Sequence, residues 1–178
     1  MSSRLRATFL SGDTVYLRAL VLEDKEHAIA WHPGPFPVNA AKAEEVLRDE
    51  HKSLSPRVQH LAIVRTHGDE IVGGARIWSD ERWTDLNVTM APALPDADEL
   101  QAAALRLLIP WLRDEVEMMV TATSIASDQP VSIAAAEQLG MERTATLRQW
   151  LARPGGRIDQ YRYEALNPDW RIEEPTDA

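Results

Sequence analysis

Seven stretches of the chain are typical of strands, and the first of them, 14–21, alternates between apolar and polar residues as a strand does when it buries one face of a sheet. The predicted strands cover residues 14–21, 60–65, 71–78, 83–90, 119–125, 144–152 and 157–166. Turn-forming residues at 67–70 and 153–156 separate two pairs of these strands, so each pair is expected to form a hairpin. Gly73 and Gly74 lie inside one predicted strand and indicate a bulge or a close approach by another backbone.

Helices are predicted between these strands where apolar residues recur every three or four positions. The first two cover residues 22–31 and 40–52, and a proline-rich segment between them breaks the helical pattern. The third runs over 98–117, and Pro110 in its middle is expected to kink it. A short fourth helix follows the turn at 128–130 and ends at Gly140.

The composition is that of one folded domain. The chain has 178 residues, of which 44% are hydrophobic and 26% are charged. We predict a single domain over 1–178, with a core of 12–170 and a frayed tail at 171–178. The longest apolar run, 107–112, is far shorter than the roughly 20 residues that span a bilayer. The N-terminus lacks an apolar segment with a cleavage site, so we expect a cytoplasmic protein with no membrane partner.

The formal net charge of −9 and the absence of cysteine exclude several classes of function. A sequence-independent nucleic-acid binder needs a surplus of Lys and Arg, so no nucleic-acid partner is expected. Without cysteine there is no disulfide, no cysteine nucleophile and no thiolate metal site, and no other metal site is predicted. The acidic balance also opposes a highly anionic ligand unless local charge compensates for it.

The segment 128–141, which reads DQPVSIAAAEQLGM, is the most informative motif. It combines a turn, a short helix of small and apolar residues and a final glycine, with a strand-like run on each side. This arrangement resembles the end of the acyl-CoA site in GNAT superfamily N-acetyltransferases. The resemblance is greatest to the RimJ/RimL-like branch, where the segment reads D-N-x-x-S-I-x-x-x-E-K-L-G-F. The matching residues are Asp128, Ser132, Ile133, Glu137, Leu139 and Gly140. Gln129 and Met141 stand where the family usually has Asn and Phe.

The order of the predicted elements is similar to that of this family along nearly the whole chain. The resemblance implies the α/β (α+β) acetyltransferase fold, with a mixed seven-stranded central sheet flanked by about four helices. It also implies transfer of an acyl group from acetyl-CoA to an amine of a small molecule or peptide. Asp159 and Trp170 stand where the RimJ/RimL-like branch has an aspartate in its last strand and a tryptophan after it.

In this family, a loop before the long helix contains glycines and often a basic residue, because amide N–H groups and the helix N-terminus approach the pyrophosphate. The equivalent loop here, 93–101, contains no glycine, lysine or arginine and carries Asp96, Asp98 and Glu99. These acids either cap the helix or repel the phosphates. The resemblance assigns the cofactor site to Val88, Thr89, Met90, Asp98, Glu99, Leu100, Gln129 and Ser132.

Few residues are candidates for proton transfer. The resemblance makes Ser132 a candidate proton donor to the leaving CoA thiolate, and capping of the short helix is its alternative role. Many other branches have a tyrosine four residues later, where this chain has Ala136. The candidate general bases are Asp85 and Asp159, with His32 and His60 as further options.

Tryptophans mark a predicted acceptor site. In this fold, the elements that carry several of them surround the acceptor cleft, and the alternative is that they fill the core. The residues assigned to the substrate are Trp31, His32, Trp78, Trp83 and Trp150. Nearby acidic residues, Asp80, Glu81 and Asp85, favour a cationic or amine-bearing small molecule as the substrate.

Two other functions stay open on the sequence alone. The loop without glycine permits a repurposed enzyme that no longer uses acetyl-CoA and does other chemistry in the aromatic cleft, because a fold does not fix a function. A non-catalytic small-molecule-binding protein is the other alternative, and the chain could act as a homodimer. Binding of coenzyme A separates the acyltransferase from both.

Overall fold

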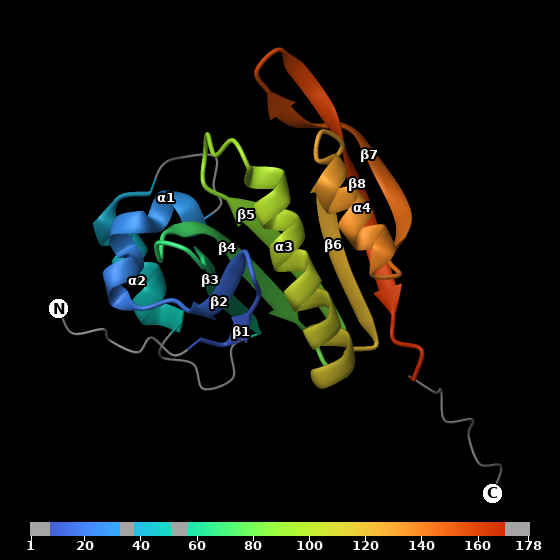
Figure 1. Ribbon diagram of the computed structural model, residues 1–178, viewed down its shortest axis with the longest axis horizontal. Coiled ribbons are helices and arrows are strands. Elements are labelled where there is room, and N and C mark those ends of the chain that lie inside the picture. The colour runs from blue at the N-terminus through green and yellow to red at the C-terminus, as the bar shows by residue number, and fades with distance from the viewer. Residues whose placement is uncertain (1–7, 33–37, 51–56, 170–178) are drawn as a thin grey trace, which may run out of the picture.

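The computed structural model describes residues 8–32, 38–50 and 57–169 (Figure 1). The predicted tail at 171–178, Trp170, most of the proline-rich segment and the end of the second predicted helix lie outside the described residues. Among the described residues, no helix is both long enough and apolar enough to cross a membrane.

The described chain forms one mixed sheet of eight strands in the order β1-β2-β3-β4-β5-β6-β8-β7. The strands are β1 (Leu10–Ser11), β2 (Val15–Ala19), β3 (Val58–Arg65), β4 (Ile71–Ser79), β5 (Trp83–Met90), β6 (Val120–Ala126), β7 (Glu142–Arg153) and β8 (Gly156–Leu166). Neighbouring strands are antiparallel except β5 and β6, which are parallel. The expected count of seven strands is corrected to eight, because β1 has only two residues and is too short to produce an alternating pattern.

The helical elements are η1 (Leu22–His27), α1 (Ala28–Trp31), α2 (Ala40–Glu50), α3 (Ala97–Pro110), η2 (Trp111–Glu115) and α4 (Pro130–Gln138). The first predicted helix is a 3-10 segment, η1, followed by the single turn of α1. The expected kink in the middle of the third helix is also corrected. Pro110 is the last residue of α3, and the chain continues as the π-helical turn η2. Proline lacks a backbone N–H, so the regular hydrogen-bond pattern is interrupted there.

Helices cover both faces of the sheet. Ile63 of β3 belongs to a core cluster that contains α3 residues, whereas the adjacent Ala62 packs in a second cluster with α1 and α2. Successive strand residues point to opposite faces, so α3 lies on one face and α1 with α2 on the other. Figure 1 shows α3 across the centre of the sheet with α4 beside β6 and β8, and the β7–β8 hairpin reaching beyond the rest of the fold.

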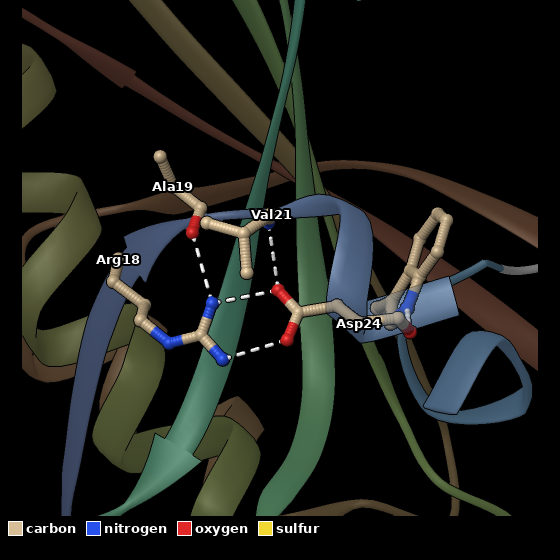
Figure 2. Close-up of polar contacts among 5 residues, drawn as sticks. Arg18, Ala19, Val21 and Asp24 are labelled. Atoms are coloured by element: carbon tan, nitrogen blue, oxygen red, sulfur yellow. Dashed lines mark hydrogen bonds and ion pairs between the residues drawn. The ribbon is translucent and has the colours of Figure 1, made fainter. Parts of the chain in front are cut away.

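A buried ion pair joins η1, the segment just before α1, to the sheet. Both Nη atoms of Arg18 in β2 donate to the carboxylate of Asp24 at 2.7 and 2.9 Å, and both side chains are almost fully buried (Figure 2). Asp24 also accepts the backbone N–H of Val21 at 2.8 Å, and its carbonyl accepts the indole N–H of Trp31 at 2.8 Å. The Asp24 carboxylate raises the pKa of Arg18, so this arginine stays charged in its buried position.

Gly73 and Gly74 were expected to mark a bulge or a close approach by another backbone, and the structure shows both. The register between β3 and β4 shifts between Ile63 and Val64, which is a bulge beside these glycines. A Cβ atom at Gly74 would lie 2.6 Å from the carbonyl oxygen of Trp31, so the backbone of α1 approaches β4 too closely for any side chain.

Candidate functional site

The two parallel strands at the centre of the sheet separate along part of their length. Their pairing runs from Trp83 opposite Val120 to Leu86 opposite Thr123. Beyond this point, β5 stays paired only with β4, and β6 stays paired only with β8. The sheet therefore has a gap between residues 87–90 of β5 and residues 124–126 of β6.

Backbone groups of β5 point into this gap. The N–H of Ala91 donates to Val72 of β4 at 2.8 Å, whereas the carbonyl of Leu86 accepts the hydroxyl of Thr123 in β6 at 2.8 Å. The polar groups of successive strand residues alternate between the two sides, so those of Val88 and Met90 face β6. The ladder between β5 and β6 does not extend to this level, so within the described strands these backbone groups are available to a ligand.

The N-termini of α3 and α4 meet beside the gap through Asp98. Its carboxylate accepts the backbone N–H of Val131 at 2.8 Å and of Ser132 at 2.9 Å. The hydroxyl of Ser132 donates to the carbonyl of Asp98 at 3.1 Å. A residue in the first turn of α3 therefore caps α4, which satisfies two of the N–H groups that α4 itself leaves unpaired.

Asp96, the N-cap residue of α3, also turns away from its own helix. It makes no side-chain cap bond, and its carboxylate accepts from Arg65 of β3 at 2.7 and 3.2 Å. The hydrogen bond from Arg65 lowers the pKa of Asp96. Glu99 is exposed, and Leu100 is buried in the core. Of the three acids in this loop, Asp96 is therefore paired with a cation, Asp98 accepts two backbone N–H groups of α4 and keeps its charge, and α3 has an N-terminus without a side-chain cap.

An amide pair holds the two helices together beneath these contacts. Nε2 of Gln129 donates to Oε1 of Gln101 at 2.7 Å, and Oε1 of Gln129 accepts the backbone N–H of Ala126 at 3.0 Å. Gln101 is buried in α3. The side chain of Gln129, which is one methylene longer than that of the Asn usual in the family, thus spans the distance between the end of β6 and α3.

The opposite face of β5 carries a different group of polar and aromatic residues. Leu86 and Val88 pack in the α3 core, so Asp85 points to the other face. Asp85 accepts from Arg162 of β8 at 2.8 Å, and the guanidinium of Arg162 lies 5.7 Å from the ring centre of Trp83. The rings of Trp83 and Trp78 meet edge to face at 5.1 Å. Asp85 is therefore paired with a cation, and the two tryptophans pack beside that pair.

Asp159 and Trp150 lie on the projecting hairpin. The register of β7 against β8 shifts between Leu147 and Leu151, and Gln149 has a left-handed backbone with φ 49°. Asp159 accepts the N–H of Gln149 at 2.8 Å, which stabilises this bulge, and Trp150 is 59% exposed. Arg153 on the same hairpin binds Asp128 at 2.9 Å, so the bulge lies at the α4 end of the gap.

Many of the residues assigned from sequence thus fall into three groups. Asp98, Gln129 and Ser132 meet at the helix N-termini, Asp85 meets the Trp78–Trp83 pair, and Asp159 lies with Trp150 on the hairpin. Trp31, the last residue of α1, is buried in the second core cluster, which was the alternative role for the tryptophans. Arg65, Gln101 and Arg162 are partners that the sequence did not indicate, because all three lie far along the chain from the residues they bind.

Comparisons with known structures agree on the fold. A protein from Sphaerobacter thermophilus assigned as an acetyltransferase is 44% identical, with 92% of this chain and 99% of that chain covered and a TM-score of 0.74. A GNAT-family acetyltransferase from Bacillus anthracis is 13% identical, with coverage of 89% and 98% and a TM-score of 0.63. A ribosomal-protein-alanine acetyltransferase from Vibrio fischeri is 13% identical, with coverage of 93% and 100% and a TM-score of 0.66. No protein-family model and no curated protein matches the sequence.

Proposed function

Because this chain belongs to the GNAT family of acetyltransferases, we propose that it transfers an acyl group from acetyl-CoA to an amine of a small molecule or peptide. The observation that carries this proposal is the gap between β5 and β6, into which the backbone groups of Val88 and Met90 point. A backbone N–H fixed at this position can stabilise negative charge on a carbonyl oxygen as the amine attacks.

The helix N-termini supply the features that a pyrophosphate needs. The first-turn N–H groups of α3 have no partners within the helix, and the positive end of the helix dipole favours phosphate. Asp96 opposes the phosphates less than the sequence suggests, because its charge is paired with Arg65. Asp98 keeps its charge while it accepts two backbone N–H groups of α4. Arg65 brings a cation beside the loop, which itself has none, and Asp96 balances its charge in this structure. These residues fit the coenzyme, which when bound supplies the reactive thioester.

Ser132 and Gln129 position α4 in this proposal. The Ser132 side chain is buried, and its hydroxyl is already bonded to Asp98. Gln129 is bonded on both sides of its amide. Their contacts hold the N-terminus of α4 against that of α3, so both helix ends face the same part of the gap.

The acceptor approaches from the face that carries Asp85. Asp85 and Glu164 are both partly exposed beside Arg162, and Trp78 and Trp83 form an aromatic wall next to them. Carboxylates and aromatic faces attract ammonium groups, which supports an amine-bearing acceptor. The bond to Arg162 suits Asp85 to orienting the acceptor.

Substitution by proline tests the backbone role. Val88→Pro removes an N–H that faces the gap and takes part in no bond to β4, so the sheet is expected to persist. This variant should bind acetyl-CoA in isothermal titration but release thiol at least about 100-fold more slowly with an amine acceptor. Thr89→Pro is the matched control, because it removes an N–H that faces β4 and should destabilise the fold. Wild-type protein that binds no acetyl-CoA at saturating concentration would refute the proposed function.

A further inference from the structure

Arg76 is an exposed arginine in β4, one of the central strands of the sheet. Its neighbours on either side, Ala75 and Ile77, are buried in the core that contains α3. Successive strand residues point to opposite faces, so Arg76 points away from α3, to the face that carries Asp85. Its guanidinium forms no hydrogen bond or ion pair with any of the described residues.

The position of Arg76 marks the boundary between the covered and the open part of this face. Two residues earlier in β4, Gly74 lies against the backbone of Trp31 in α1. Arg76 itself lies opposite Asn87 of β5, which is also exposed. Asn87 is the first residue of β5 beyond the ladder with β6. Arg76 therefore lies beside the start of the gap, where the covering by α1 ends.

The neighbouring charges on this face are already balanced. Arg162 donates to Asp85 at 2.8 Å and lies 3.7 Å from Glu164, so two carboxylates share one guanidinium. Arg76 has no such counter-charge among the described residues. A guanidinium presents its N–H donors in a planar fork that matches the two oxygens of a carboxylate. The unbalanced cation is therefore suited to an anionic group of the acceptor.

The sheet register sets the spacing between this cation and the acids. Trp78 lies opposite Asp85, and Arg76 lies opposite Asn87, so Arg76 and Asp85 are diagonal neighbours. Diagonal neighbours in an antiparallel pair are roughly 7 Å apart. A small molecule with an amine and a carboxylate a few bonds apart can contact both side chains at once.

We infer that Arg76 binds a carboxylate of the acceptor, an inference that rests on the proposed function. The acceptors are then amino acids and similar small amines that carry a carboxylate, with the amine beside Asp85 and the aromatic wall. A phosphate fits this position less well, because Asp85 and Glu164 repel a dianion more strongly than a monoanion. The phosphates of the coenzyme do not compete, since the N-terminus of α3 lies on the opposite face.

Matched acceptors test this role. The probes are the standard amino acids and their decarboxylated amines, with release of thiol from acetyl-CoA as the readout. Wild type should favour an amino acid over its amine by at least about tenfold in kcat/KM. Arg76→Gln should lose about 10- to 100-fold for the amino acid, through KM, and stay within about twofold for the amine. Arg76→Lys should keep part of the preference, because lysine retains the charge without the fork.

Arg106→Gln is the matched control, since Arg106 is an exposed arginine of α3 without a partner among the described residues. It should keep the wild-type preference. The inference is overturned if wild type acetylates the decarboxylated amines at least as fast as the amino acids, or if Arg76→Gln slows both kinds of acceptor equally. Failure of the proposed function would look different, because wild type would then bind no acetyl-CoA and acetylate neither kind of acceptor.

Discussion

The carboxylate of Asp98 in α3 caps the N-terminus of α4 by accepting the backbone N–H of Ser132 at 2.9 Å. The cap comes from a residue 34 positions earlier in the chain, so it ties two helices together as well as satisfying one. Helix caps normally come from the residue just before the helix, and Gln129 at that position makes no side-chain cap bond. The acid that stands in the family's glycine-rich loop is therefore part of the framework of the site.

Replacing Asp98 with alanine should lower the free energy of unfolding by about 1–2 kcal/mol, the usual cost of losing a cap. Urea denaturation with a constant m-value would measure this loss. Glu99→Ala is the control, because Glu99 lies in the same helical turn but is exposed. Equal effects of the two substitutions would mean that Asp98 acts only through the dipole of its own helix.

Removal of Asp24 should be more costly. Asp24→Ala leaves the buried guanidinium of Arg18 without its counter-charge, which typically costs about 3–5 kcal/mol. The double variant Arg18→Met with Asp24→Ala should recover part of this loss, since the unpaired charge is gone. Chemical denaturation of the four proteins in a double-mutant cycle gives the coupling. Glu45→Ala breaks the exposed pair with Lys42 and should leave stability within error.

Gly74→Ala should displace α1 from the sheet. The new Cβ would meet backbone atoms of Trp31 at 2.6 and 2.7 Å, so main chain must move, at a cost of about 1–3 kcal/mol. Loss of hydrogen-exchange protection at the Trp31 indole N–H, observed by NMR, would report the movement. Gly68→Ala controls for backbone strain alone, because Gly68 has φ +99° and nothing lies near its added Cβ. Protection in that control should be unchanged.

The fold could be predicted from sequence because its signals are local. Short strand-like runs between turn residues predicted every strand of three or more residues, and Gly73 with Gly74 indicated a bulge or a close approach by another backbone. The strand β1 was not predicted, because two residues are too few to show a repeating apolar pattern. Pro110 indicated an irregularity, but the sequence could not show that the chain would continue as a π-helical turn there.

The site was harder to predict because its properties depend on partners distant in sequence. Asp96 and Asp98 read as repulsive toward phosphate until the positions of Arg65 and the α4 backbone are known. Asp85 read as a free carboxylate, yet Arg162 lies 77 residues further along the chain. Sequence supplies the charges at a site, whereas folding decides which of them are already paired.

The pair of Asp96 and Arg65 should make stability depend on acid pH. Arg65 lowers the pKa of Asp96 in the folded state below the unfolded value near 4. The unfolded state then binds more protons, so stability rises with pH in this range. The contribution is complete above about pH 5 and is lost as pH falls through the folded pKa. Unfolding free energies of wild type and Asp96→Asn should therefore differ at pH 6 and converge toward pH 3. A constant difference between the two proteins would show that the ion pair does not form in solution.

The same pair should also set the affinity for acetyl-CoA, with opposite effects from its two members. Asp96→Asn removes a negative charge at the N-terminus of α3 and releases Arg65, so the dissociation constant should fall by a factor on the order of five. Arg65→Gln removes the cation and should raise the dissociation constant by a similar factor. Both changes should shrink as salt increases, because the charges are partly exposed.

Isothermal titration can distinguish this effect from a general change in the fold. Acetyl-pantetheine lacks the pyrophosphate, so its affinity should be the same for wild type and both variants. Glu70→Gln provides a second control, because Glu70 also lies near Arg65, at 3.7 Å, but belongs to the β3–β4 turn rather than to α3. Its effect on the affinity for acetyl-CoA should be smaller than that of Asp96→Asn. An unchanged affinity in Arg65→Gln would mean that the helix N-termini bind the pyrophosphate without this cation.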